Sequence, residues 1–121
     1  MQNLIKESIE IILNEKSKYS DIKDSIDKLA MNFYQITNLS GNLKKAEHGT
    51  ILPDGEALTP QTAAGCIFDY VRTTKFLRGI KKALDFQVNT LKKKKVHIMY
   101  VGCGPHATLL VTLMKFYVKM H

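Results

Sequence analysis

Apolar residues recur at helical spacing twice in the first third of the chain. Residues 2–18 carry one apolar stripe and residues 20–37 carry another, so each segment predicts an amphipathic helix. Ser20 is expected to cap the second helix, and Asn38–Gly41 to end it. We expect the two helices to form an antiparallel pair that packs on other elements. The positions expected to face inward are Leu4, Ile5, Ile9, Ile12 and Leu13, then Ile22, Ile26, Leu29, Ala30, Phe33 and Ile36.

The middle of the chain predicts a turn followed by a long helix. Residues 42–59 are irregular, and the turn residues Pro53-Asp54-Gly55 indicate a small hairpin or an ordered loop. Thr59-Pro60 is a helix start, because a capping hydroxyl precedes a proline in the first turn. This helix is expected to run from Pro60 to about Leu84, with inward positions at Ala64, Ile67, Phe68, Val71, Leu77, Ile80 and Leu84.

The last third changes from a basic segment to an apolar one. Lys92–Lys95 precede the β-branched run Val96–Val101, which predicts a buried strand of a parallel sheet. A glycine turn at Gly102–Pro105 and a helix from Ala107 to Val118 are expected to follow. Strand, glycine turn and helix make one half of a βαβ unit, so the expected class is α/β with a mainly helical N-terminal part.

Composition restricts the class of protein further. The chain has 121 residues, a formal charge of +7, 45% hydrophobic and 24% charged residues, which fits one folded domain or part of one. Two cysteines are too few for a disulfide framework, and no Cys/His cluster has zinc-finger spacing. The N-terminal residues do not form a signal peptide, so we expect a cytoplasmic location.

The glycine turn is the first candidate for ligand binding. Gly102 and Gly104 allow positive φ angles and close approach of a ligand to the backbone, and Pro105 suits the first position of the following helix. Free amides at a helix start favour polar or anionic groups. A lone G-x-G also occurs in tight turns that bind nothing, so a purely structural turn stays open.

The residues Val96–Pro105 resemble motif I of class I S-adenosylmethionine-dependent methyltransferases. The resemblance implies a Rossmann-like sheet, of which this chain carries the first strand, glycine turn and helix. It also implies S-adenosylmethionine as cofactor, with its methionine part wrapped by Gly102, Cys103, Gly104, Pro105 and His106. The chain departs from the family pattern at Tyr100, where an acidic residue is usual, and at His106, where a third glycine is usual.

A second match lies about thirty residues upstream. Asp69-Tyr70-Val71-Arg72-Thr73 resembles the D-x-x-R-T helix of protein arginine methyltransferases, which implies that Arg72 pairs with the cofactor's carboxylate. A guanidinium suits that role because it donates two parallel hydrogen bonds to a carboxylate. Residues 55–114 as a whole also resemble a bacterial methyltransferase-like family. The alternative for Asp69 and Arg72 is a surface pair at i, i+3 spacing.

Together these features predict two regions and one function. Residues 1–58 are expected to hold the helical pair and the hairpin, and residues 59–121 the long helix and the start of a Rossmann-like domain. We expect the N-terminal fragment of a methyltransferase-like protein, a cofactor-binding half-site that is inactive alone because no acidic-ended second strand follows. The methyl acceptor is not indicated. The alternative is a helical interaction or dimerisation module without catalytic activity, which would form a homo-oligomer.

Other features predict no further site. Lys92–Lys95 lack aromatic interleaving, so we expect a solvated linker rather than a contact with nucleic acid or lipid. Residues 96–114 carry no charged side chain, but glycines, a proline and histidines interrupt them, so no membrane span is expected. Cys103 is expected to be structural, and His106 to lie exposed at a helix start. No metal site is expected at His48, His97, His106 or His121.

Overall fold

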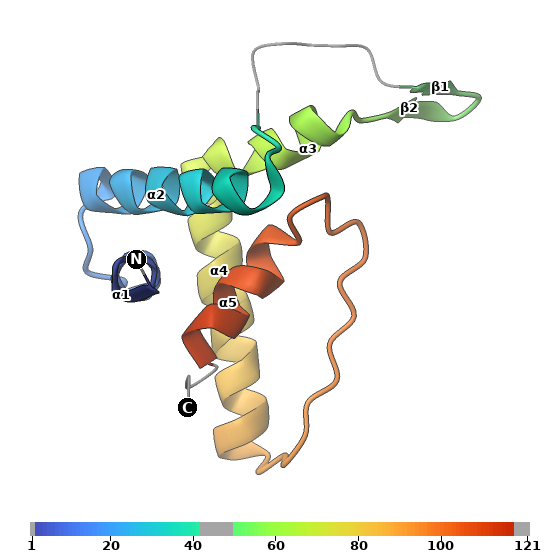
Figure 1. The fold of residues 1–121 in the computed structure, drawn as a ribbon. Coiled ribbons are helices and arrows are strands. Elements are labelled where there is room, and N and C mark those ends of the chain that lie inside the picture. Colours follow the sequence, from blue (N-terminus) through green and yellow to red (C-terminus); the bar gives the residue numbers. More distant parts are fainter. Residues whose placement is uncertain (1, 42–49, 118–121) are drawn as a thin grey trace.

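The computed structural model describes residues 2–41 and 50–117 (Figure 1). Within these ranges the chain is mainly helical, with one small two-stranded antiparallel sheet. The elements are α1 (Gln2–Leu13), α2 (Tyr19–Thr37), β1 (Thr50–Leu52), β2 (Gly55–Ala57), α3 (Pro60–Gly65), the 3₁₀ turn η1 (Cys66–Phe68), α4 (Tyr70–Asp85), the π-helical turn η2 (Phe86–Thr90) and α5 (Thr108–Tyr117).

Helices α1 and α2 form where the apolar periodicity predicts them, but their ends and packing differ. Helix α1 stops at Leu13, short of the expected residue 18. Helix α2 follows Lys18, which makes no side-chain capping bond, so Ser20 is not its N-cap. Asn38 ends α2 in the left-handed conformation, at φ 54°. The two helices cross instead of running antiparallel. In Figure 1, α2 lies across the view while α1 is seen end-on.

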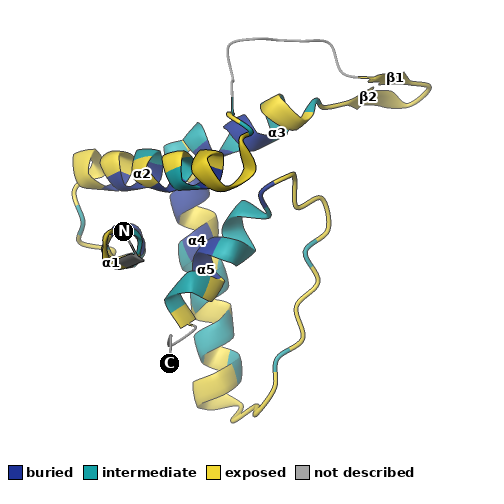
Figure 2. Cartoon of the chain, viewed as in Figure 1, coloured by how far each residue is buried: buried dark blue, intermediate teal, exposed yellow. Residues whose placement is uncertain are grey.

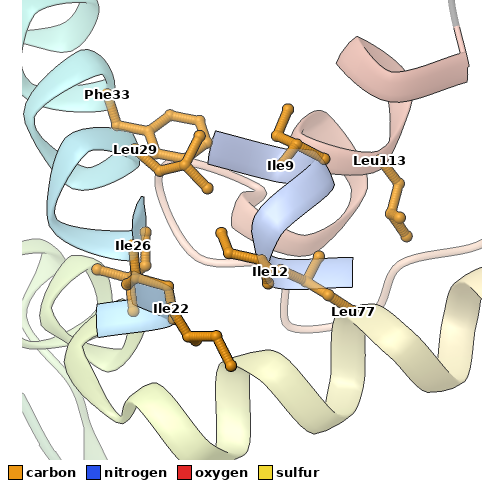
Figure 3. Close-up of a cluster of buried hydrophobic side chains, with 9 residues drawn as sticks. Ile9, Ile12, Ile22, Ile26, Leu29, Phe33, Leu77 and Leu113 are labelled. Atoms are coloured by element: carbon orange, nitrogen blue, oxygen red, sulfur yellow. The ribbon is translucent and has the colours of Figure 1, made fainter. Parts of the chain in front are cut away.

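The hydrophobic core draws on four helices and η1. Figure 3 shows side chains of α1 between those of α2 and those of α4 and α5. The core therefore includes residues from both sides of the boundary expected between residues 58 and 59. Three of the expected inward positions, Leu4, Ile36 and Val71, lie at the surface. The buried members are Ile9, Ile12, Ile22, Ile26, Leu29, Phe33, Ile67, Leu77 and Leu113.

The helix expected over residues 60–84 is interrupted near its first third. Thr59 caps α3 as predicted, since its Oγ1 accepts the Thr62 N–H at 3.2 Å. Asp69 then leaves the helical region, with φ −77° and ψ 82°, and its carboxylate accepts the Arg72 N–H at 3.1 Å. A new N-cap thus starts α4. The buried Thr73 hydroxyl donates to the Ile67 carbonyl at 3.0 Å and holds η1 against α4.

The predicted hairpin is present as β1 and β2. Leu52 pairs with Gly55 across a turn at Pro53 and Asp54, and Thr50 pairs with Ala57 at the open end. Every residue of the two strands is exposed (Figure 2). The hairpin pairs with no other strand among the described residues.

The strand predicted at Val96–Val101 is not formed, and this part of the prediction is wrong. The segment arcs away from the lower end of α4 to the start of α5 (Figure 1), and β1 and β2 are the strands of the described chain. Met99 is 87% exposed and Val101 81%. An apolar, β-branched run forms a strand only where a neighbour supplies backbone hydrogen bonds, and no described segment does so. The expected helix end at Val118 lies outside the described residues, as do His48 and His121.

Candidate functional site

The glycine turn adopts the backbone conformation that its sequence predicts. Gly102 and Gly104 both have φ 67°, in the left-handed region that glycine enters without steric cost. A Cβ added at Gly102 would meet open space, and one at Gly104 would meet the Ala63 side chain at 3.9 Å. Residues 102–105 are exposed, so the backbone of the turn faces solvent. The two glycines therefore give the turn its backbone conformation, and the space beside Gly102 is open to a ligand.

The start of the following helix differs from the expectation. Helix α5 begins at Thr108, so Pro105 is not its first residue, and Cys103 lies outside its N-terminus. Ala107, with φ 43°, bends the chain between the turn and the helix. The exposed Cys103 thiol donates locally to the Gly104 carbonyl at 3.3 Å. Residues 103–105 therefore shape the turn. The free backbone amides at the start of α5 are those of Thr108 and the residues after it.

His106 is buried, not exposed as predicted. Only 8% of the residue is accessible, and its imidazole stacks on Phe33 with 5.2 Å between ring centroids and 9° between planes. Its Nε2 lies 3.0 Å from the Thr37 hydroxyl. Ring stacking and one hydrogen bond offset the cost of removing the imidazole from water. His106 thereby anchors the glycine turn to α2.

The partners of Thr37 determine which imidazole nitrogen carries a proton. Thr37 Oγ1 donates to the Phe33 carbonyl at 2.8 Å and accepts the Leu39 N–H at 3.2 Å. Its one hydrogen is therefore already used, so His106 must donate from Nε2. We assign His106 a protonated Nε2 on this ground.

Arg72 lies in the first turn of α4. Its guanidinium lies over the Phe76 ring, 5.7 Å from the centroid, and its residue is exposed. Asp69 contacts the Arg72 backbone N–H, and the two side chains form no ion pair. Among the described residues the guanidinium has no carboxylate partner. The structure thus places Gly102–His106 in one turn, shows no hydrogen bond or ring contact between Arg72 and that turn, and leaves the guanidinium open to an anion.

Beside His106 lies a pocket of about 360 Å³, which we call the α2 pocket. Ala64, Ile67 and His106 are its buried walls, while Met31 and Tyr34 are exposed at its rim. Its residues on α2 follow i, i+3, i+4, i+7 spacing, a second stripe beside the core stripe. That spacing is the signal that sequence reasoning missed. The pocket is lined by Asp27, Ala30, Met31, Tyr34, Ser40, Gly41, Ala64, Ile67, Phe68 and His106.

A second hollow, of about 500 Å³, lies between the C-terminal half of α4 and the extended segment. Lys93, Lys95 and residues 96–99 line one side of it, and Ile80 and Leu84 the other. Lys92–Lys95 are exposed, as expected of a solvated linker, although the strand that they were expected to enter is absent. Exposed apolar and basic groups thus lie side by side here.

Comparisons with protein-family models, with curated proteins and with solved structures found no match to this chain. Within residues 2–41 and 50–117, no three His, Cys, Asp or Glu side chains gather where a metal ion would bind. None of the described helices combines the length and apolar character needed to cross a membrane.

Proposed function

We propose that this chain is the cofactor-binding portion of an S-adenosylmethionine-dependent methyltransferase-like protein. The observation that carries the proposal is the pair of positive φ angles at Gly102 and Gly104, in an exposed turn that leads to a helix. In the family that the sequence resembles, such a turn wraps the methionine part of the cofactor. His106 supports the turn by its contacts with Phe33 and Thr37.

Arg72 supports the same proposal by its chemistry. An exposed guanidinium without a carboxylate partner among the described residues can bind the cofactor's carboxylate through two parallel hydrogen bonds. The turn and Arg72 would have to approach each other on binding. The segment Val96–Val101 would then join a Rossmann-like sheet as a strand, with neighbours that the described residues do not supply.

We expect no methyl transfer by this chain alone. Family members hold the cofactor's ribose hydroxyls with an acidic side chain after the glycine turn, but residues 86–121 contain no Asp or Glu. Positioning supplies most of the rate of a direct displacement, so a half-site that holds one end of the cofactor would not catalyse it.

Thermal unfolding with S-adenosylhomocysteine tests the proposal. Ligand at about 1 mM should raise the melting temperature, because it binds only the folded chain. Arg72→Met should abolish the shift, whereas Lys75→Met, which removes an equally exposed cation from the same helix, should preserve it. Absence of a shift in the wild-type chain, with folding verified by circular dichroism, would overturn cofactor binding.

A second function, self-association as a helical interaction module, is favoured by the extended segment. Except for His97, the side chains of this segment, Val96–Val101, are apolar or aromatic. Met99 is nevertheless 87% exposed and Val101 81%, and the backbone of the segment has no strand partner among the described residues. An unpaired strand-like edge of this kind pairs readily with another chain. Light scattering over a range of concentrations should show a dimer, and Val101→Lys should dissociate it. Ile36→Lys, which makes the same kind of change at an exposed position on α2, should leave the dimer intact. A monomer at every concentration would exclude this function.

A further inference from the structure

The α2 pocket is lined by an acidic side chain, although the protein as a whole is basic. The chain carries a net charge of +7, yet Asp27 is the one charged side chain among the described residues that line the pocket. The hollow beside α4, by contrast, is lined by Lys93 and Lys95. Asp27 therefore favours a cation in the α2 pocket once its ion-pair partner Lys23 is displaced, whereas Lys93 and Lys95 disfavour one in the other hollow.

Aromatic rings complete the lining. Tyr34 at the rim, Phe68 and the imidazole of His106 lie around a pocket whose remaining walls are mostly apolar. The electron-rich faces of such rings attract organic cations. Apolar walls favour a cation that carries alkyl groups over a metal ion or an ammonium ion without them. One carboxylate with aromatic and apolar walls is the combination that binds alkylated ammonium groups.

We propose that the α2 pocket binds a small alkylated cation of the quaternary ammonium class. Its volume of about 360 Å³ lies near the lower end of the range for small-molecule sites, which suits a compact head group. The pocket adjoins the proposed cofactor turn at His106, the last residue of that turn, whereas neither Arg72 nor residues 102–105 line it.

Lys23 is the internal competitor for this ligand. Its Nζ lies 3.0 Å from Asp27 Oδ2, while the Tyr70 hydroxyl donates to Asp27 Oδ1 at 2.7 Å. The Lys23 side chain is 46% exposed, and an exposed i, i+4 ion pair contributes little stability. Lys23 can therefore move into water when another cation reaches Asp27, and Tyr70 keeps the carboxylate in place.

A titration with choline followed by amide NMR tests the proposal. Choline should give saturable shifts at Ala30, Gly41 and Ala64, and 3,3-dimethylbutan-1-ol, its uncharged analogue of the same shape, should bind about 10-fold more weakly or not at all. Choline has no carboxylate for Arg72, so its binding reports on this pocket and not on the cofactor turn. Equal binding of the alcohol, or no shifts at these residues in the wild-type chain, would overturn the proposal.

Variants at exposed or half-buried positions sharpen the test without removing the core. Asp27→Asn should weaken choline binding about 10-fold, and Asp24→Asn on the same helix should leave it unchanged. Lys23→Gln should strengthen binding, because it removes the competing cation. The dispersion of each variant's own spectrum verifies its fold. If Asp27→Asn and Asp24→Asn bind choline equally, Asp27 is not part of the site and the proposal fails.

The ring at the rim allows one further comparison. Tyr34→Leu keeps an apolar side chain but removes the aromatic face, so it should weaken choline binding several-fold. Tyr19→Leu makes the same change on α2 outside the pocket and should have no effect. Unchanged binding in Tyr34→Leu would contradict recognition by aromatic rings.

Discussion

The imidazole of His106 lies parallel to the phenyl ring of Phe33, with 5.2 Å between the ring centroids. This contact joins the glycine turn to α2. The hydrogen bond between His106 and Thr37 is a second contact between the same two parts of the chain. Phe33 also belongs to the hydrophobic core. The conformation of the turn is thus coupled to the packing of α2.

His106→Ala should therefore destabilise the whole fold. Loss of the stacked ring and of one buried hydrogen bond should lower the free energy of unfolding by about 2 kcal/mol. His97→Ala is the matched control, because His97 is exposed on the neighbouring segment and should change stability little. Urea unfolding followed by circular dichroism measures both. Equal stabilities would mean that His106 does not anchor the turn.

Periodicity predicted most of the core but little of the C-terminal third. Ile9, Ile12, Ile26 and Leu29 are buried where the helical stripe of each segment places them. Such positions follow from local spacing, because one face of an amphipathic helix must leave water. Pairing is not local. The run Val96–Val101 has strand-like residues, but a strand also needs a neighbour that no local pattern supplies.

The candidate site was predictable to the same limited extent. Two glycines separated by one residue predicted the positive φ angles of the turn, and the structure confirms them. The burial of His106 could not be predicted, since its partners Phe33 and Thr37 lie about seventy residues away along the chain. The break in the helix at Asp69 did have a local signal, because a carboxylate can cap a new helix. The apolar stripe that continues over residues 60–84 predicted an unbroken helix instead.

Gly41 has a steric requirement for glycine. A Cβ at this position would lie 2.6 Å from the Gly65 Cα, and that neighbour is backbone and cannot turn aside. Gly41→Ala should cost about 2 kcal/mol or more of stability, because the loop after α2 must move away from α3. Gly79→Ala has open space and a helical position, so it should stabilise the chain by up to about 1 kcal/mol. Thermal unfolding compares the two; a harmless Gly41→Ala would contradict the close approach.

Two buried hydroxyls lack hydrogen-bond partners. Thr74 on α4 and Thr112 on α5 have inaccessible Oγ1 atoms that bond to nothing in the described structure. Valine has the same shape without the hydroxyl, so Thr112→Val should raise the free energy of unfolding by about 1 kcal/mol. Thr73→Val is the contrasting variant, because Thr73 donates to the Ile67 carbonyl and its loss should destabilise. If both variants shift stability in the same direction, the hydroxyl of Thr112 has a partner in solution.

Arg78 ties α4 to the end of α1. Its Nε donates to the Ile12 carbonyl at 2.8 Å and its guanidinium to the Asn14 carbonyl at 2.7 Å, so it satisfies acceptors that a helix C-terminus leaves open. Arg78→Met should lower stability by about 2 kcal/mol. Arg72→Met, on the same helix but with an exposed side chain, should lower it by less than about 0.5 kcal/mol. Chemical unfolding of the pair checks this, and equal losses would contradict a specific role for Arg78.

Asp85 should make stability depend on pH in acid. Hydrogen bonds from Lys81 and then from Tyr117 hold the pKa of this carboxyl below its usual 3.8. A carboxyl whose pKa is lower in the folded state stabilises that state above the unfolded pKa, and this contribution is lost as the pH falls through the folded pKa.

Asp85→Asn should therefore flatten the fall in stability below about pH 4. The side chain of Asp85 is 35% exposed, so solvent screening limits its contribution to less than about 1 kcal/mol. The wild-type chain and the variant should converge in stability in strong acid and differ at neutral pH. Glu7→Gln, which removes an exposed carboxyl on α1, should retain the wild-type dependence. Urea midpoints measured from neutral pH into acid give the comparison. Parallel curves for wild type and Asp85→Asn would show that the hydrogen bonds from Lys81 and Tyr117 to the Asp85 carboxylate do not stabilise the folded chain.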